Sequence, residues 1–267
     1  MSRIDEVFEK LRGEGRVALM PFLVAGDPSL KMTGQLILEL AKSGADIIEL
    51  GVPFSDPLAD GPTIQRASQR ALAGGVTLTA ILDFLKGLRR QTDIPIVLMG
   101  YYNPIYHYGV ERFAEDARTC GADGIIVPDL PPEEAGELVA AARKAGLDTI
   151  FLVAPTSTAE RIEKIGSVSR GFIYYVSLAG VTGTRKELAS GIAESVGNIR
   201  KQSDMPVCVG FGISTPEHVR QVSRYADGAI VGSALVSLIE KIQNDPKCSD
   251  VVARFIRELR AATVKSD

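Results

Sequence analysis

Residues 41–50 read AKSGADIIEL, and this stretch decides the fold because its pattern returns along the chain. In each copy a small residue or glycine ends a helix, an aspartate follows, and a short run rich in isoleucine and valine comes next. Such a pattern predicts a helix C-cap that leads into a buried parallel strand. The other clear copies are TCGADGIIV (119–127), KAGLDTIFL (144–152) and YADGAIVG (225–232).

Four weaker copies bring the number of predicted strands to eight. They are VALMPFLV (17–24), IPIVLM (94–99), GFIYYV (171–176) and MPVCVG (205–210). Their average spacing of about 30 residues is the length of a βα unit. Eight such units without a polar linker predict an α/β fold, a single-domain (β/α)8 barrel over residues 1–267. The alternative is a doubly wound open sheet, which seldom needs eight parallel strands at this length.

The segments between the strands have the apolar period of amphipathic helices. The period is clear at Leu36, Ile37 and Leu40, and again over residues 252–259. A further stripe, formed by Ile4, Val7, Phe8 and Leu11, precedes the first strand. The sequence therefore predicts an extra N-terminal helix that closes the bottom of the barrel.

Composition and charge exclude several classes of protein. The 267 residues are 45% hydrophobic and 24% charged, with a net charge of −3, which argues against nucleic acid or an anionic membrane as the main partner. Three widely spaced cysteines, Cys120, Cys208 and Cys248, lack metal-ligand spacing and fit a reducing compartment. The first 15 residues are too charged for a signal peptide, and the apolar run over 17–26 is too short to cross a bilayer. These features predict a soluble cytoplasmic protein (or a protein of the plastid stroma, if the source is a plant).

The loops after the strands offer carboxylates rather than histidines. Active sites of (β/α)8 barrels lie at the C-terminal ends of the strands, and neither His107 nor His218 falls there. The absence of histidine there disfavours a His-ligated metal site and a histidine base. No lysine lies there either, which disfavours a Schiff-base mechanism. Glu49, by contrast, ends the second predicted strand, and Asp60 follows in a proline-rich loop. Two carboxylates at one mouth can be held at different pKa values and divide acid and base work between them.

Both carboxylates also have simpler interpretations. Glu49 fits a structural ion pair inside the barrel, because a buried charge needs a partner. Asp60, with Gly61 and Pro62 after it, fits an ordinary turn before a helix.

Glycines after the sixth, seventh and eighth strands predict a phosphate site. They lie at Gly180, Gly183, Gly210, Gly212 and Gly232, the last of these before Ser233. Backbone N–H groups and a helix N-terminus bind phosphate at this end of many barrels. Each glycine alone also fits a tight turn, and Ser233 fits an N-cap. The apolar wall expected between the phosphate and the carboxylates consists of Phe22, Met99, Val127, Phe211 and Ile230. It favours a substrate with an aromatic ring, although core packing explains the same residues.

From end to end, the chain resembles the tryptophan synthase alpha chain family. The most specific motif is IIELGVPFSDPLADGPTIQ (47–65), supported by PFLVAGDP (21–28), GVTGTR (180–185), VGFGIS (209–214) and VGSA (231–234). The resemblance implies a (β/α)8 barrel that cleaves indole-3-glycerol phosphate to indole and glyceraldehyde 3-phosphate, without a cofactor of its own. It also implies a pyridoxal-phosphate beta chain as partner in an αββα tetramer.

The resemblance further implies roles for individual residues. Glu49 is expected to protonate indole C3 and to take the proton of the glycerol hydroxyl. Asp60 is expected to accept a hydrogen bond from the indole N–H and to stabilise the cationic intermediate. Phe22, Met99 and Phe211 are expected at the indole ring, Tyr174 at the substrate, Thr182 in the loop that closes toward Asp60, and Gly183, Gly212, Gly232 and Ser233 at the phosphate. Pro53, Asp56 and Asn103 are expected at the beta-chain interface.

Other functions stay open on the sequence alone. The segments 99–104 and 127–129 depart from the enteric-bacterial form and look like cyanobacterial or plant members, some of which are stand-alone indole-releasing lyases. A phosphosugar isomerase or epimerase would use the same barrel and phosphate site, but a metal-ligand set or second catalytic pair is not visible. A subunit that only binds a phosphorylated ligand has no use for two carboxylates at the mouth.

Overall fold

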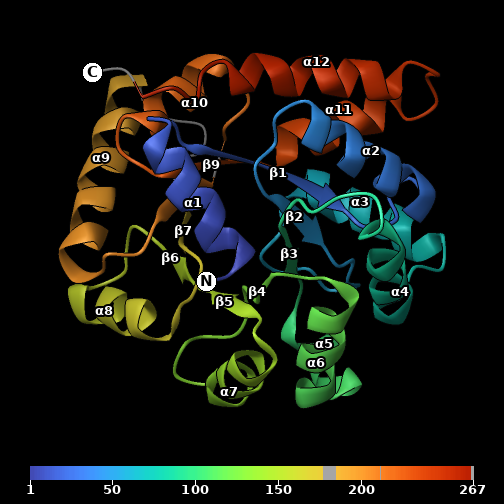
Figure 1. Cartoon of the computed structure of the whole chain (residues 1–267), viewed down its shortest axis with the longest axis horizontal. Coiled ribbons are helices and arrows are strands. Elements are labelled where there is room, and N and C mark those ends of the chain that lie inside the picture. The colour runs from blue at the N-terminus through green and yellow to red at the C-terminus, as the bar shows by residue number, and fades with distance from the viewer. Residues whose placement is uncertain (177–184, 211, 266–267) are drawn as a thin grey trace.

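In the described part of the chain, nine parallel strands form an inner ring that helices surround (Figure 1). The computed structural model describes residues 1–176, 185–210 and 212–265, with the side chains of 185–190 left out. The strands are β1 (Ala18–Val24), β2 (Ile48–Gly51), β3 (Ile96–Met99), β4 (Gly124–Ile126), β5 (Asp148–Ile150), β6 (Leu152–Val153), β7 (Ile173–Val176), β8 (Val207–Gly210) and β9 (Gly228–Val231).

The helices pack outside this ring. They are α1 (Arg3–Gly13), α2 (Leu30–Lys42), α3 (Pro62–Ala73), α4 (Leu78–Leu88), α5 (Tyr102–Tyr108), α6 (Val110–Cys120), α7 (Gly136–Ala145), α8 (Ala159–Val168), α9 (Arg185–Gln202), α10 (Pro216–Ser223), α11 (Ser233–Ile242) and α12 (Cys248–Arg260). No single helix among the described residues is long and apolar enough to cross a membrane. Only α3 and α4 taken together reach that composition, with a bend of 91° between them.

The strand order closes the sheet into a barrel. The order is β5-β4-β3-β2-β1-β9-β8-β7-β6, so the two ends of the sheet are β5 and β6. These two strands follow each other in the chain and are separated only by Phe151, whose carbonyl accepts the N–H of Tyr174 at 3.1 Å. The predicted strand at 144–152 is therefore one barrel strand that is interrupted. The (β/α)8 barrel expected from the sequence is confirmed, and the open sheet is excluded.

Alternate strand residues fill the inside of the barrel. Phe22 on β1, Glu49 on β2 and Val97 on β3 are register partners and share the inner face. The apolar cluster inside the barrel contains Met20, Val97, Ile126, Ile150, Phe172, Cys208 and Ile230, with Met99, Leu152 and Tyr174 packed against it. Because the inside of the described barrel is packed, a ligand on the barrel axis is expected at the C-terminal mouth, where (β/α)8 enzymes bind their substrates.

Helix α1 closes the opposite end, as the sequence predicts. Ser2 and Asp5 form a capping box at its start: the Ser2 N–H donates to Asp5 at 2.8 Å, and the Asp5 N–H donates to Ser2 Oγ at 3.2 Å. Ile4, Phe8 and Leu11 are buried in the interior cluster, and the Phe8 ring lies 6.1 Å from that of Phe172. Truncating Phe8 to alanine would cost about 3–5 kcal/mol by cavity formation.

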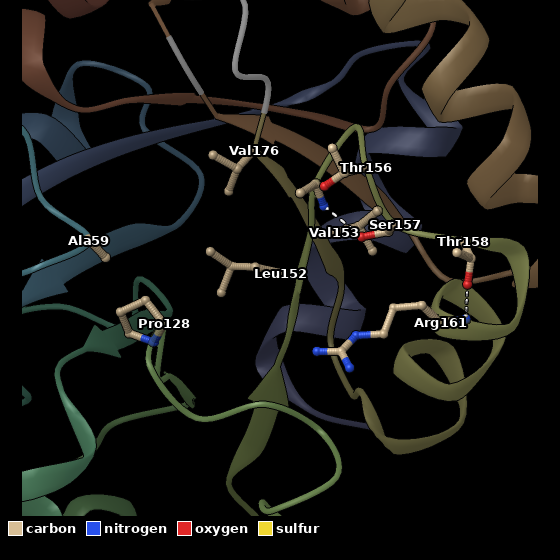
Figure 2. Close-up of a pocket in the computed structure, with 10 residues that line it drawn as sticks. Ala59, Pro128, Leu152, Val153, Thr156, Ser157, Thr158, Arg161 and Val176 are labelled. Carbon is tan, nitrogen blue, oxygen red and sulfur yellow. Dashed lines mark hydrogen bonds between the residues drawn. The ribbon is translucent and has the colours of Figure 1, made fainter.

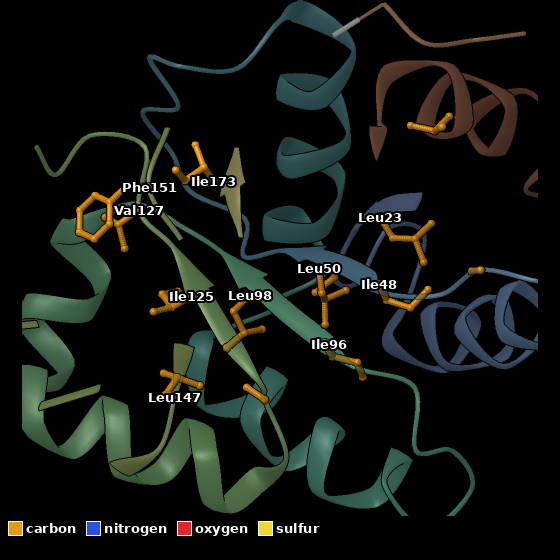
Figure 3. Close-up of a cluster of buried hydrophobic side chains, with 14 of the residues drawn as sticks. Leu23, Ile48, Leu50, Ile96, Leu98, Ile125, Val127, Leu147, Phe151 and Ile173 are labelled. Carbon is orange, nitrogen blue, oxygen red and sulfur yellow. The ribbon is translucent and has the colours of Figure 1, made fainter. Parts of the chain in front are cut away.

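The outer face of each strand packs against the helices. Figure 3 shows part of this outer cluster, which includes Leu50 and Leu98. Val127 belongs to the same cluster, beside Phe151, and is 6% exposed. The expectation that Val127 lines the ligand pocket is therefore wrong, because Ile126 occupies the inner face at the end of β4.

Candidate active site

Glu49 is the buried ionisable group at the mouth of the barrel. It lies on β2, faces inward and is only 3% exposed. Its Oε2 has no hydrogen-bond partner among the described residues, and none of the ion pairs found there includes it. Burial, reinforced by the nearby charge of Asp60, raises the pKa of Glu49 from 4.5 to about 8. A pKa near 8 favours the neutral carboxylic acid at pH 7, and together with the missing ion pair it disfavours a structural ion pair within the described part of the chain.

Asp60 lies in the loop between β2 and α3, one residue before Gly61, the N-cap of that helix. Burial raises its pKa, and a hydrogen bond from the Tyr101 hydroxyl opposes this change. The Gln65 side chain donates to the Asp60 carbonyl at 2.9 Å and so fixes the backbone here. Because the charge of Asp60 acts on Glu49, the structure brings together the two carboxylates that the sequence singles out.

Tyr101 holds the Asp60 loop, a role that the sequence does not predict. It lies two residues after the end of β3 and is 5% exposed. Its hydroxyl accepts a hydrogen bond from the Ala59 N–H at 2.9 Å and lies close enough to the Asp60 carboxyl to lower the pKa of that group. Its ring stacks on Phe54, with centroids 5.2 Å apart. The one signal in the sequence is that Tyr101 is the second residue after a barrel strand, where functional residues gather.

An apolar wall lies beside Asp60. A cavity of about 10 Å³, roughly the size of one water, is lined by Phe22, Val24, Gly51, Val52, Asp60, Ile64, Ser68, Met99, Gly100 and Tyr101. A Cβ at position 51 would come within 2.6 Å of Phe22 Cζ, so glycine there lets the Phe22 ring lie across the end of β2. Phe22 and Met99 thus lie where the sequence predicts an aromatic-binding wall. Ile230 faces inward but lies deeper, in the barrel cluster.

A larger cavity opens at the other side of the mouth. Its volume is about 620 Å³, which suits a ligand of drug size. Figure 2 shows Leu152 and Val176 reaching into the space that Ala59 and Pro128 border on the far side. The rest of the wall, which the sequence does not predict, consists of Val153, Ala154, Thr156, Ser157, Thr158 and Arg161.

Tyr174 connects the two sides of the mouth. It lies on β7 in register with Leu152, and its side chain faces the interior. Burial and the charge of Glu49 raise the pKa of Tyr174 well above its usual value. A Cβ at Gly210, on the adjacent strand β8, would collide with the Tyr174 hydroxyl, so glycine at 210 makes room for this ring. The structure therefore places Tyr174 close to Glu49.

The predicted phosphate site falls partly within the described residues. Gly232 caps α11, which begins at Ser233, and a Cβ on Gly232 would lie 3.8 Å from Phe22. Gly212 has a φ of +64°, a conformation that favours glycine. The N-terminus of α11 therefore lies at the mouth, next to Phe22 of the apolar wall. Thr182, Gly183 and Phe211, and with them Gly180, lie outside the described residues.

The three predicted interface residues differ in exposure. Asp56 and Asn103 are exposed at the mouth, on the β2–α3 loop and on α5, whereas Pro53 is buried in the chain itself. The same two segments carry the exposed apolar side chains of Leu58, 95% exposed, and Tyr106, 63% exposed. His107 lies on α5 and His218 on α10, and no cluster of metal-binding side chains occurs among the described residues.

Fold and site together define the class: a (β/α)8-barrel enzyme whose mouth holds a buried glutamate of raised pKa, a second carboxyl group and an apolar wall. A family model described as "Tryptophan synthase alpha chain" matches residues 8–264. The alpha chain of Geobacter sulfurreducens is 53% identical over 262 residues, covering 98% of this chain and 99% of that protein. The alpha chain of Geotalea uraniireducens is 52% identical over 261 residues, covering 98% and 97%.

Solved structures agree with these sequence relatives. The tryptophan synthase alpha subunit of Legionella pneumophila superposes with a TM-score of 0.92 at 42% identity, covering 98% of each chain. A chain of Mycobacterium tuberculosis tryptophan synthase superposes with a TM-score of 0.90 at 38% identity, covering 100% of each. The chain belongs to the tryptophan synthase alpha chain family. Its activity is that of a lyase of tryptophan biosynthesis that cleaves indole-3-glycerol phosphate.

Proposed function

We propose that Glu49 and Asp60 divide the work of cleaving indole-3-glycerol phosphate to indole and glyceraldehyde 3-phosphate. The observation that carries the proposal is the state of Glu49: 3% exposed, with a free Oε2 among the described residues and a pKa raised to about 8. A buried carboxylic acid that is protonated at neutral pH is suited to protonate a carbon atom.

The steps balance with these two side chains. Glu49 gives its proton to indole C3, and the ring becomes a cationic indolenine whose N–H is held by the Asp60 carboxylate. The Glu49 carboxylate then takes the proton of the hydroxyl on the adjacent carbon, and a carbonyl forms as the C3–C3′ bond breaks. The electrons of that bond return to the ring and neutralise the cation, so Glu49 ends protonated as it began.

The proposed substrate contacts follow from the geometry of the mouth. Phe22 and Met99 border the ring site beside Asp60, and Tyr174 lies near Glu49. The phosphate is assigned to Gly212, Gly232 and Ser233, because the N-terminal N–H groups of α11 and its dipole favour a dianion. Thr182, Gly183 and Phe211 are assigned to the same ligand, as the family resemblance implies.

The partner is proposed to be a tryptophan synthase beta chain in an αββα tetramer, with pyridoxal phosphate on the beta chain alone. The exposed Asp56 and Asn103, together with the apolar Leu58 and Tyr106, support an interface at the mouth. Pro53 would act there by shaping the loop, because it is buried. A mouth covered in this way would keep water from the reaction.

Three further assignments accompany this function. The chain needs no cofactor of its own, since Glu49 and Asp60 supply every proton transfer and charge in the steps above. Residues 1–267 act as one barrel domain. The enzyme is assigned to the cytoplasm (or to the plastid stroma, if the source is a plant), in keeping with three free cysteines.

The test is indole release from indole-3-glycerol phosphate by the purified chain, measured with and without a beta chain. Slow release that the beta chain accelerates supports the full proposal. Full turnover by the chain alone would instead assign it to the stand-alone lyases, and absence of release in both samples would refute the function.

A further inference from the structure

Four charged side chains connect three segments near the mouth through a chain of ion pairs. Arg70 donates from Nε and Nη2 to the two carboxylate oxygens of Asp27, at 2.8 and 2.7 Å. Its third nitrogen, Nη1, donates to Glu240 Oε1 at 2.6 Å. Arg66 then binds both oxygens of Glu240, at 2.9 and 2.8 Å. Bidentate ion pairs of this kind define the relative orientation of the two side chains as well as their distance.

Each end of this network leads to a different part of the site. Arg66 and Arg70 lie one turn apart on α3, whose first turn holds the Asp60 backbone through Gln65. Glu240 lies on α11, the helix that begins at Ser233, where the phosphate is placed. Asp27, in the loop after β1, has a side chain that is only 4% exposed. The network therefore joins the helix behind Asp60 to the helix behind the phosphate.

An apolar layer connects the same elements beneath the charges. It consists of Phe22, Val24, Ile64, Ala67, Ala71 and Val236, from β1, α3 and α11. Helices α3 and α11 lie side by side next to β1 (Figure 1). The apolar contacts hold the helices together, but they restrict sliding less than paired hydrogen bonds do. Arg70 and Glu240 are 28% and 23% exposed, so bulk solvent screens their contact only in part.

We propose that Arg70 and Glu240 are positioning residues that set the spacing between Asp60 and the N-terminus of α11. This rests on the proposed function, in which one substrate carries an indole at one end and a phosphate at the other. A ligand held at both ends gains affinity only where the two sites are spaced to match it. Loss of the ion pair between α3 and α11 should therefore weaken the binding of ligands that span both sites and spare ligands that fill only one.

The test compares three probes by calorimetry: indole, sn-glycerol 3-phosphate, and indole-3-propanol phosphate, which spans both ends and lacks the hydroxyl needed for cleavage. Glu240→Ala removes the ion pairs of Arg66 and Arg70 with α11, keeps the apolar contacts between the helices and leaves Arg70 paired with Asp27. In this variant we expect the Kd of the spanning probe to rise about tenfold, and the Kd of each short probe to change by less than about twofold. The kcat/KM for indole-3-glycerol phosphate should fall by about the same factor as the affinity of the spanning probe.

Two further variants complete the experiment. Arg70→Lys keeps the charge beside Asp27 but cannot form bidentate hydrogen bonds. It should therefore change the affinities of the three probes in the same pattern, to a smaller degree. This variant carries the test if Glu240→Ala does not fold. Glu115→Gln is the matched control, because it removes an exposed ion pair between α6 and α7, Lys144–Glu115 at 3.6 Å. It should leave the affinity of all three probes unchanged.

Two results would overturn the inference. Unchanged binding of the spanning probe in Glu240→Ala and Arg70→Lys would show that the network does not set the spacing. Equal weakening of sn-glycerol 3-phosphate and the spanning probe would show damage to the phosphate site alone. Failure of the proposed function is recognised separately, because the unaltered chain would then neither release indole nor bind the spanning probe more tightly than the short ones.

Discussion

Replacing Glu49 with glutamine separates a catalytic role of this side chain from a structural one. Glutamine keeps the size of the side chain but carries no transferable proton. Cleavage should fall by about 10² to 10⁴, the usual contribution of general acid–base catalysis, while indole-3-propanol phosphate still binds. A glutamate held in an ion pair would behave differently, because its replacement would reduce stability.

The pKa of Glu49 also predicts how the variant changes stability. The unfolded chain releases this proton near pH 4.5, whereas the folded chain keeps it to about pH 8. Between these values the native state binds more protons, so the stability of the natural chain falls as the pH rises through this window. At about 1.4 kcal/mol per pKa unit, the loss reaches about 5 kcal/mol above pH 8, as an upper limit. Glutamine has no proton to lose, so above pH 8 the free energy of unfolding of Glu49→Gln should exceed that of the natural chain by up to this amount.

The assay is urea unfolding of both proteins at pH 5 and pH 9, together with single-turnover cleavage at pH 7. Titrating groups that are not coupled to Glu49, such as Asp46 with a pKa raised to about 6, contribute equally to both proteins and cancel. Glu9→Gln, on the exposed side of α1, is the control and should change neither quantity. Near-normal cleavage by Glu49→Gln, or lower stability than the natural chain at pH 9, would refute the assignment of Glu49 as a neutral acid.

Three further replacements test other parts of the site. Asp60→Asn should reduce cleavage by about 10² or more through lost stabilisation of the cation, whereas Asp60→Glu should keep measurable activity in single turnover; equal rates for the two would remove the need for a charge. Tyr101→Phe should lower kcat by about tenfold, because Asp60 and the Ala59 N–H lose their partner, and should leave the Kd for sn-glycerol 3-phosphate as it is; an unchanged kcat would contradict its role. Ser233→Asp should raise KM strongly and lower kcat less, since a carboxylate there repels the phosphate; an unchanged KM in steady-state kinetics would exclude Ser233 from the phosphate site.

The barrel could be predicted from the sequence because helix C-caps, aspartates and apolar runs recur at the length of a βα unit. The ends of those strands led directly to Glu49 and Asp60. Which residues of each strand face the barrel interior was harder to predict, because both faces of a parallel strand are buried and apolar. Val127 shows the difficulty: Ile125, Ile126 and Val127 look alike in the sequence, and only the pairing of Gly124 with Val97 and Asp148 decides which of them point inward.

Contacts between distant segments could not be predicted. The role of Tyr101 depends on the loop 54–60 folding back over the end of β3, where the Ala59 N–H meets its hydroxyl. The network from Asp27 through Arg70 to Glu240 joins three regions of the chain that share no local pattern. The interruption of the fifth barrel strand at Phe151 could not be predicted from the sequence either, because the residues next to it are as apolar as those of an unbroken strand.

The protonation state of Glu49 can be measured directly by infrared spectroscopy. The difference spectrum between the natural chain and Glu49→Gln isolates the vibration of this one carboxyl group. At pH 7 it should contain the C=O stretch of a neutral carboxylic acid, and this band should give way to a carboxylate band as the pH rises through about 8. A carboxylate band alone at pH 7 would contradict the mechanism, because Glu49 would then have no proton to give to indole C3.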